Sequence, residues 1–375
     1  MATKKKPSKK DLPIEPVEAV QGLLDLPPMP IGAEVLPPEG DGQGEGDESD
    51  WLREGMLVLD HYDDVAVKDD TTSMEFPVYA LTKRASTEIR SYVRGNRTLR
   101  VIPSMVGAAT IFDKDLIMYC LSHIVRKINE KAPVSPVVKV NVGPFLVATN
   151  RSTGGAAYER VIDMCRRLRG TTIETNIKTT EAERTKGFGL LENYEVTQWT
   201  KNGKGALQIK LILPQWIMRM AQNFDVLTLN PAYYELDQAL ERRLYEIARK
   251  HCGSDAWFEI SLPLLKEKTG STTTLRKFRV ELNHISEKDS LPEYWLIIDT
   301  SAKPARAVFF SRDNAKVMKA ATHHGRVAWL DFLLKKRIEQ QQKKNKKSDP
   351  KAAPAKRSRK AKSTSAQGEM LDSAA

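Results

Sequence analysis

Residues 152–171, STGGAAYERVIDMCRRLRGT, have the pattern of one helix with a start signal, an apolar stripe and a basic face. Ser152 and Thr153 can cap its start, and Gly170 lies where a helix is expected to stop. Gly154 and Gly155 allow a backbone to come close to whatever lies ahead of the helix. The stripe has the spacing of one buried helix face. It consists of Ala157, Val161, Met164, Cys165 and Leu168.

The arginines of this stretch lie off the stripe and allow two interpretations. They are Arg160, Arg166, Arg167 and Arg169. Arginine runs usually mark a solvated face, so an ordinary amphipathic helix is the first. The second is a DNA-binding helix, because a β-hairpin follows with Asn202-Gly203 at its tip between Lys201 and Lys204. In a winged-helix unit the second helix of a pair enters the major groove and the hairpin rests on the phosphates.

A second basic helix follows the same order of elements roughly 120 residues later. Residues 271–274, which include Thr272, Thr273 and Thr274, are expected to cap it. Its apolar stripe is Leu275, Phe278, Leu282 and Ile285, and its other faces carry Arg276, Lys277, Arg279, Asn283 and His284. A hairpin with Lys303 and Arg306 in its turn comes next. Each half thus reads as long helix, short strand, short helix, hydroxyl-rich turn, basic helix and hairpin.

These patterns predict an α+β fold of two tandem winged-helix domains with disordered tails. The expected parts are a disordered acidic region rich in Pro and Gly (1–73), a first winged-helix domain (74–222), a second (223–314), a C-terminal helix (315–342) and a basic disordered tail (343–375). Other expected elements are a strand over 76–81, a helix from Asp113 to about Glu130, strands over 188–199 and 206–213, and a helix from Pro231 to near Gly253. Gly325 is a candidate break in the C-terminal helix.

Charge is distributed unevenly along the 375 residues, whose net charge is +11. The first 74 residues carry 7 basic and 17 acidic side chains, whereas residues 335–375 carry 13 basic and 4 acidic ones. A basic body with a basic tail favours a polyanionic partner, with nucleic acid first. Ribosomal or membrane-surface contact would produce a similar charge, so composition alone does not choose among them.

Cysteine usage and hydropathy indicate a cytoplasmic protein without a membrane partner. Cys120, Cys165 and Cys252 are few and far apart, so we expect small buried hydrophobic residues in a reducing compartment. No stretch approaches the length of a membrane span. The lysines near the N-terminus have no apolar core behind them, so they do not form a secretory signal.

A search for catalytic patterns predicts no enzyme, cofactor or metal. No G-x-x-x-x-G-K-[ST] phosphate loop occurs, and His323-His324 has no third ligand at metal-site spacing. Asp69 and Asp70, together with Asp60, Asp63 and Asp64, are interpreted as solvated charges at the edge of the acidic region. Glu241, Arg242 and Arg243 are interpreted as a surface patch.

Several blocks of sequence resemble plasmid replication initiator protein A of proteobacteria. They are FPVYAL (76–81), ATIFDKDLIMYC (109–120), TGGAAYERV (153–161), LILPQWIMR (211–219), LTLNPAYYEL (227–236), LERRLYEIARKHCG (240–253), LRKFRVEL (275–282) and SLPEYWLII (290–298). The resemblance covers about residues 75–312 and leaves the acidic region and the basic tail outside.

This resemblance implies an initiator that binds repeated origin sequences, called iterons, in double-stranded plasmid DNA. It also implies opening of adjacent AT-rich DNA, recruitment of the host initiator and the replicative helicase, and a homodimer in the idle or self-repressing state. A winged-helix transcriptional repressor without a replication role is the alternative. An origin nuclease is disfavoured by the absence of ligand spacing.

The residues expected to contact DNA lie on the two basic helices, the turns before them and the hairpin tips. Arg276, Lys277, Arg279 and Asn283 are expected to read one major groove, because Arg and Asn can make bidentate contacts to base edges. Phosphate or adjacent-groove contacts are expected from Thr153, Gly154, Gly155, Tyr158, Arg160, Arg167, Lys201, Lys204, Thr272, Thr273, Thr274, Lys303 and Arg306.

Overall fold

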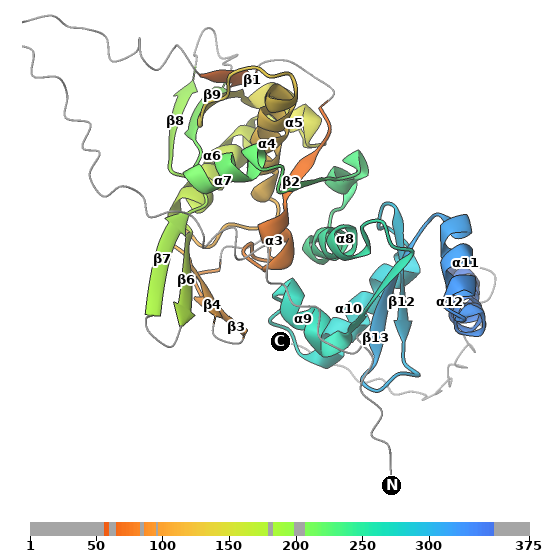
Figure 1. The fold of residues 1–375 in the computed structure, drawn as a ribbon. Coiled ribbons are helices and arrows are strands. Elements are labelled where there is room, and N and C mark those ends of the chain that lie inside the picture. Colours follow the sequence, from red (N-terminus) through yellow and green to blue (C-terminus); the bar gives the residue numbers. More distant parts are fainter. Residues whose placement is uncertain are drawn as a thin grey trace, which may run out of the picture. The chain divides into compact units, whose positions relative to one another are not determined.

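The computed structural model describes residues 56–59, 65–82, 86–94, 97–178, 183–198 and 207–348. The fold mixes helices and sheets, as the sequence predicts (Figure 1). The chain divides into two compact units, of which the first ends at Val327 and the second begins at Ala328. The first unit contains two hydrophobic cores, one built mainly from residues before 222 and the other mainly from residues after 228. The predicted boundary at residues 222–223 falls between α7 (Gln215–Gln222) and β10 (Val226–Thr228).

The first core is enclosed by helices and a four-stranded sheet. Its helices are α4 (Lys114–Asn129), α5 (Val142–Ala148) and α6 (Gly155–Gly170). Its strands are β1 (Leu57–Leu59), β5 (Val137–Asn141), β8 (Asn193–Gln198) and β9 (Leu207–Ile212). They lie in the order β1-β5-β9-β8, with β1 parallel to β5 and the other pairs antiparallel.

The second core repeats this arrangement with three strands. Its helices are α8 (Ala239–Cys252), α9 (Leu262–Thr269) and α10 (Leu275–Lys288). Its strands are β11 (Trp257–Ser261), β12 (Tyr294–Asp299) and β13 (Arg306–Ser311), in the order β11-β13-β12. In the first half the last strand, β9, lies between β5 and β8, and in the second half the last strand, β13, lies between β11 and β12, so the predicted repeat of element order extends to the strand pairing.

A second four-stranded sheet interrupts the first half. It consists of β3 (Arg90–Arg94), β4 (Arg97–Ile102), β6 (Thr172–Lys178) and β7 (Glu183–Gly189), in that order. The predicted single strand over 188–199 is therefore wrong, since it spans the end of β7 and all of β8. Leu190 and Leu191 are both buried, which breaks the alternation that one continuous strand requires.

Residues 76–81 form no regular strand, contrary to the prediction. They follow α3 (Thr71–Glu75), and Ala80 makes an isolated bridge with Thr110. The guanidinium of Arg90 donates to the carbonyl oxygens of Pro77, Val78 and Tyr79 at 3.2, 2.8 and 3.2 Å. This side chain satisfies acceptors that a neighbouring strand would otherwise satisfy.

The predicted helices after Pro231 and after Asn314 are each divided in two. A 3₁₀ helix, η1 (Pro231–Glu235), precedes α8, which starts with a capping box between Gln238 and Glu241. The C-terminal helix breaks at Gly325, as predicted, because Gly325 has a φ of +63° between α11 (Asn314–His323) and α12 (Val327–Ser348). The three cysteines are buried, as predicted, and burial raises the pKa of Cys165 and Cys252 to about 12.

Residues 65–75, here called the joining segment, are folded, although residues up to 73 were expected to be disordered. The segment contains β2 (Lys68–Asp70), which pairs with β10, and α3. Asp70 caps α3 by accepting hydrogen bonds from the backbone N–H and the hydroxyl of Ser73 at 2.6 and 2.5 Å. The acidic composition that suggests a solvated segment is therefore used for helix capping and for buried ion pairs.

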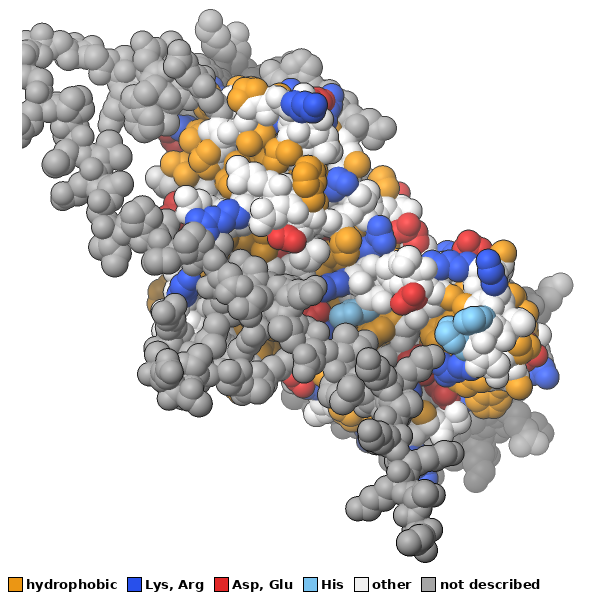
Figure 2. Space-filling view, in the orientation of Figure 1, with side chains coloured by type: hydrophobic (Ala, Val, Ile, Leu, Met, Phe, Trp, Pro, Cys, Tyr) orange, Lys and Arg blue, Asp and Glu red, His pale blue; other side chains and the backbone are white. Residues whose placement is uncertain are grey.

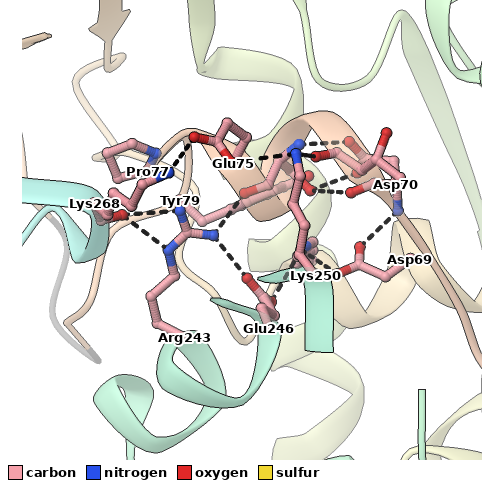
Figure 3. Close-up of polar contacts among 12 residues, drawn as sticks. Asp69, Asp70, Glu75, Pro77, Tyr79, Arg243, Glu246, Lys250 and Lys268 are labelled. Carbon is pink, nitrogen blue, oxygen red and sulfur yellow. Dashed lines mark hydrogen bonds and ion pairs between the residues drawn. The ribbon is translucent and has the colours of Figure 1, made fainter. Parts of the chain in front are cut away.

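Buried charges connect the joining segment to both halves of the unit (Figure 3). Lys114 Nζ of α4 lies 2.6 Å from Asp69 Oδ2 and 3.0 Å from Glu246 Oε1 of α8. Arg243 donates to the other oxygen of Glu246 at 2.9 Å and to the carbonyl oxygen of Ser73 at 2.7 Å. Burial raises the pKa of Glu246. The charges of Lys114 and Arg243 outweigh this effect and hold the pKa of Glu246 below its ordinary value.

The interpretation of Glu241, Arg242 and Arg243 as a surface patch is wrong, because all three are buried. Arg242 Nη1 donates to both carboxylate oxygens of Asp115 on α4 at 2.7 and 2.8 Å, and its guanidinium lies 4.7 Å from the Phe112 ring centroid. The carboxylate that allows Arg242 to be buried is therefore supplied by a helix of the other half. Asp69 is likewise buried and paired, not solvated.

Glu75 joins α3 to the second half through three basic side chains. It forms ion pairs with Lys268 of α9 and, at 3.4 Å, with Lys250 of α8, and lies 3.2 Å from His251 Nε2. Burial raises its pKa, but the hydrogen bond from His251 and the charges of Lys250 and Lys268 together lower it well below the ordinary 4.5. Ionised Glu75 therefore stabilises the fold fully above pH 4.5, and this contribution is lost as the pH falls below that value.

We expect Glu75→Gln to lower the free energy of unfolding at pH 7 by about 3 kcal/mol, because it leaves buried cations without their carboxylate. The difference from the wild type should shrink as the pH is lowered from 5 towards 3.5 in urea titrations. Glu130→Gln is the control, since exposed Glu130 pairs with Arg126 on the surface and should contribute little. A difference that is constant with pH would contradict this assignment.

Candidate nucleic-acid interface

The exposed face of α10 carries cations that no part of the described chain neutralises. Arg276, Lys277 and Arg279 are all exposed. Within the described ranges, none of the three side chains forms an ion pair, hydrogen bond or ring contact. Charges without an internal partner are available to a polyanion, so this face is the strongest candidate for contact with nucleic acid.

The start of α10 is fixed by a hydroxyl cap, as the sequence predicts. Thr274 is the N-cap, and its Oγ1 accepts from the backbone N–H of Lys277 at 3.4 Å. Thr272 is exposed, whereas the Thr273 hydroxyl lies 3.0 Å from that of Ser271. Gly270, with a φ of +73°, ends α9 and turns the chain towards α10.

The apolar stripe of α10 is shorter than predicted and one apolar residue lies off it. Phe278, Leu282 and Ile285 are buried as expected, but Leu275 is 44% exposed, because the first helical residue lies beyond the core. Val280 is 63% exposed among charged residues. The predicted stripe and the predicted DNA contacts do not include Val280, although an apolar side chain outside the helical stripe is a readable signal.

α6 has the predicted stripe but a different start. Ala157, Val161, Met164, Cys165 and Leu168 are its buried residues. Ser152 and Thr153 do not cap the helix, because Gly154 is the N-cap and makes no side-chain cap hydrogen bond. A Cβ at Gly154 or Gly155 would meet nothing within 4 Å, so no neighbour in the described chain requires glycine at either position.

The arginines of α6 differ from those of α10, because most have partners within the protein. Arg167 donates to Asp113 through Nε at 2.8 Å and Nη2 at 2.7 Å. Arg166 pairs with Asp163 at 2.8 Å, and Arg160 Nη2 donates to Ser152 Oγ at 3.1 Å. Of these contacts, the one between Arg167 and Asp113 positions the helix against the start of α4 in its own half.

The other exposed residues of α6 include both acidic and basic side chains. Tyr158 is half-buried and packs on the first core. Glu159 is exposed on the same helix, and Asp163 is half-buried, so carboxylates interrupt the basic face. Arg169 is exposed near the C-terminal end. α10 also carries exposed carboxylates, at Glu281 and Glu287, so what makes α10 better suited to contact phosphates is that the three cations of its exposed face have no partner among the described residues.

The structure describes the tip of the second predicted hairpin but not that of the first. Lys201 and Lys204 lie outside the described residues. Lys303, between β12 and β13, is exposed, whereas Arg306 pairs with Glu259 at 3.3 Å, and Glu259 also pairs with Arg326. On the face shown in Figure 2, Lys and Arg side chains form separate groups among neutral and apolar ones. On this face, a nucleic-acid contact would therefore depend on particular residues and not on one continuous basic patch.

The described part of the chain provides neither a metal site nor a membrane-spanning helix. In the ranges that the structure describes, no group of three or more His, Cys, Asp or Glu side chains could hold a metal ion. Among the described residues, no helix is both long enough and apolar enough to cross a membrane.

Comparisons with known proteins identify the family. The model of the family described as Replication initiator protein A matches residues 68–296. A protein of Wigglesworthia glossinidia brevipalpis, named as a candidate replication protein, is 35% identical over 251 residues, which are 65% of this chain and 91% of the relative. Because the family model matches more than half of the chain, the chain belongs to the replication initiator protein A family.

Two solved structures are similar at lower identity. A crystal structure of domains 2 and 3 of RctB has a TM-score of 0.48 and 12% identity, and covers 62% of this chain and 94% of that chain. A second crystal structure of RctB domains 2–3 has a TM-score of 0.44 and 11% identity, and covers 64% of this chain and 97% of that chain.

The two kinds of arginine should differ in their effect on stability. Arg167→Ala leaves the buried carboxylate of Asp113 without its guanidinium, so we expect a loss of about 1.5–3 kcal/mol in the free energy of unfolding. Arg276→Ala removes an exposed side chain without a partner, so the change should stay within about 0.5 kcal/mol. Urea unfolding of both variants measures the difference, and equal losses would show that Arg167 is not a structural residue.

Proposed function

We propose that this chain is a plasmid replication initiator that binds iterons in double-stranded origin DNA through two winged-helix modules. Its membership of the replication initiator protein A family supports the replication role. The observation that carries DNA binding is the face of α10, where Arg276, Lys277 and Arg279 are exposed and have no partner among the described residues.

The order of elements supports the winged-helix assignment in the second half. α9 and α10 are two short helices joined by a turn that contains Gly270, and β12 and β13 form the hairpin that follows. A helix pair with a glycine-containing turn is the arrangement of a helix-turn-helix, in which the second helix enters the major groove. The first half, from α4 to β9, has the same strand order and would be the second module.

In the proposed complex, α10 reads bases and the elements around it hold the backbone. Arg276 would donate to a guanine edge and Asn283 would pair with an adenine edge, since these side chains match the bidentate patterns of those bases. Lys277, Arg279, Thr272, Thr273 and Lys303 would contact phosphates on either side. Phosphate contacts fix the register of the protein but carry no sequence information directly.

α6 would contribute mainly backbone contacts near its start. Gly154 and Gly155 leave open space ahead of the helix, and Thr153 and Arg160 lie beside it, so a phosphate could approach the backbone N–H groups there. Arg167 acts in this proposal through Asp113 as a positioning residue and not as a direct DNA contact.

The remaining steps rest on the family resemblance. The bound protein would open the adjacent AT-rich DNA and recruit the host initiator and replicative helicase in the bacterial cytoplasm, and a homodimer would be the idle form. A transcriptional repressor with the same modules would bind the same DNA without opening it. Permanganate reactivity of thymines beside the repeats separates the two, because unpaired thymines react only in opened DNA.

We expect the full-length chain to bind a duplex with its own plasmid's origin repeat about a thousandfold more tightly than a scrambled duplex. Arg276→Ala should reduce this discrimination by about 1–3 kcal/mol, because it loses a base contact. Lys303→Ala should weaken binding to both duplexes equally and lower the salt slope by about 1, because it loses a phosphate contact. Fluorescence anisotropy across a salt series measures all three proteins.

Arg166→Ala is the matched control, since its guanidinium pairs with Asp163 on α6. It should retain the wild-type discrimination. Equal losses on cognate and scrambled DNA for Arg276→Ala would remove this residue from base recognition. Binding by the wild type without any preference would overturn the proposed function.

A further inference from the structure

Val280 lies at the centre of the outward face of α10. The buried residues of this helix are Phe278, Leu282, Ile285 and Ser286. At about 100° per residue, Val280 is on the side opposite to their mean direction. Its neighbours one turn away are Arg276 and Lys277 before it and Asn283 and His284 after it. This apolar side chain therefore lies between Arg276 and Asn283, the two residues proposed to read bases, and Asn283 is half-buried.

This valine is more exposed than the other apolar residues of α10. It is 63% exposed, compared with 44% for Leu275 at the first turn. A β-branched residue has lower helix propensity than alanine, so neither packing nor helix formation accounts for valine here. Its side chain is also short and cannot form hydrogen bonds, so it gains nothing from phosphates. It can contribute only by touching an apolar group that comes close to the helix.

The major groove offers one apolar group among the base edges, the C5 methyl of thymine. We propose that Val280 contacts a thymine methyl at the centre of the base sequence read by α10, next to the bases contacted by Arg276 and Asn283. This inference rests on the proposed function and adds a specificity determinant to it. The repeat bound by this protein would then contain a thymine whose methyl group is recognised independently of its hydrogen-bonding edge.

Replacement of thymine by uracil tests this contact, because the two bases differ in the major groove by that methyl alone. The full-length wild type is used to select bound duplexes from a randomised pool. Each thymine of the selected site is then replaced singly by deoxyuridine. At one thymine we expect a loss of about fourfold in affinity, which corresponds to about 0.8 kcal/mol for one buried methyl group.

The decisive comparison combines this substitution with Val280→Ala. The variant should bind the thymine duplex about fourfold or more weakly than the wild type, whereas the two proteins should bind the uracil duplex equally. Met318→Ala is the control, because Met318 is also an exposed apolar residue, on α11. It should retain the full thymine preference.

The outcomes separate this inference from the proposed function. If no sequence is selected from the pool, the proposed function fails. If a sequence is selected but no single uracil weakens binding, or Val280→Ala keeps the same sensitivity to uracil, the Val280 contact is overturned while the initiator remains. Unchanged DNA binding by Val280→Ala together with loss of binding to a protein of the replication machinery would assign this face to a protein partner.

Discussion

The rest of the first unit depends on the ion pairs that are buried where its two cores meet. Lys114 of α4 requires both Asp69 of the joining segment and Glu246 of α8 within 3.0 Å. An ion removed from water costs several kcal/mol unless its partners are in place. The joining segment, α4 and α8 must therefore be present together, and replacing one partner leaves a buried charge without compensation.

The two halves share an order of elements but use their basic helices differently. In α6, the guanidinium of Arg167 holds Asp113 at the start of α4 and so contributes to the fold of its own half. In α10, Arg276 and Arg279 face solvent, while Phe278 and Leu282 hold the helix to the core. In the proposed complex, α10 would serve recognition, whereas Arg167 of α6 stabilises the fold of its own half. This division accounts for a proposed interface centred on the second half.

Periodicity predicts the helices well, because apolar stripes such as those of α6 and α10 are set by residues close together in the chain. The same reasoning fails for charged residues that are buried by distant partners. Arg242 and Asp115 are separated by 127 positions, and Lys114 and Glu246 by 132. A single sequence contains no sign of such pairing, so Arg242, Arg243 and Asp69 were assigned to solvent. The exposure of the cations on α10 was easier to predict, because charges such as Arg276 follow the usual rule that charge faces water.

The ion pairs between α4 and α8 also fix the distance between the two halves of the first unit. Arg242 with Asp115, and Lys114 with Glu246, tie the helix that opens one half to the corresponding helix of the other. In the proposed complex, the separation between the two modules is then a property of the protein and not of a flexible linker. B-DNA turns once in about 10.5 base pairs. In the proposed complex, two short sequences would therefore be bound together only if their spacing placed both on the side of the DNA that faces the protein.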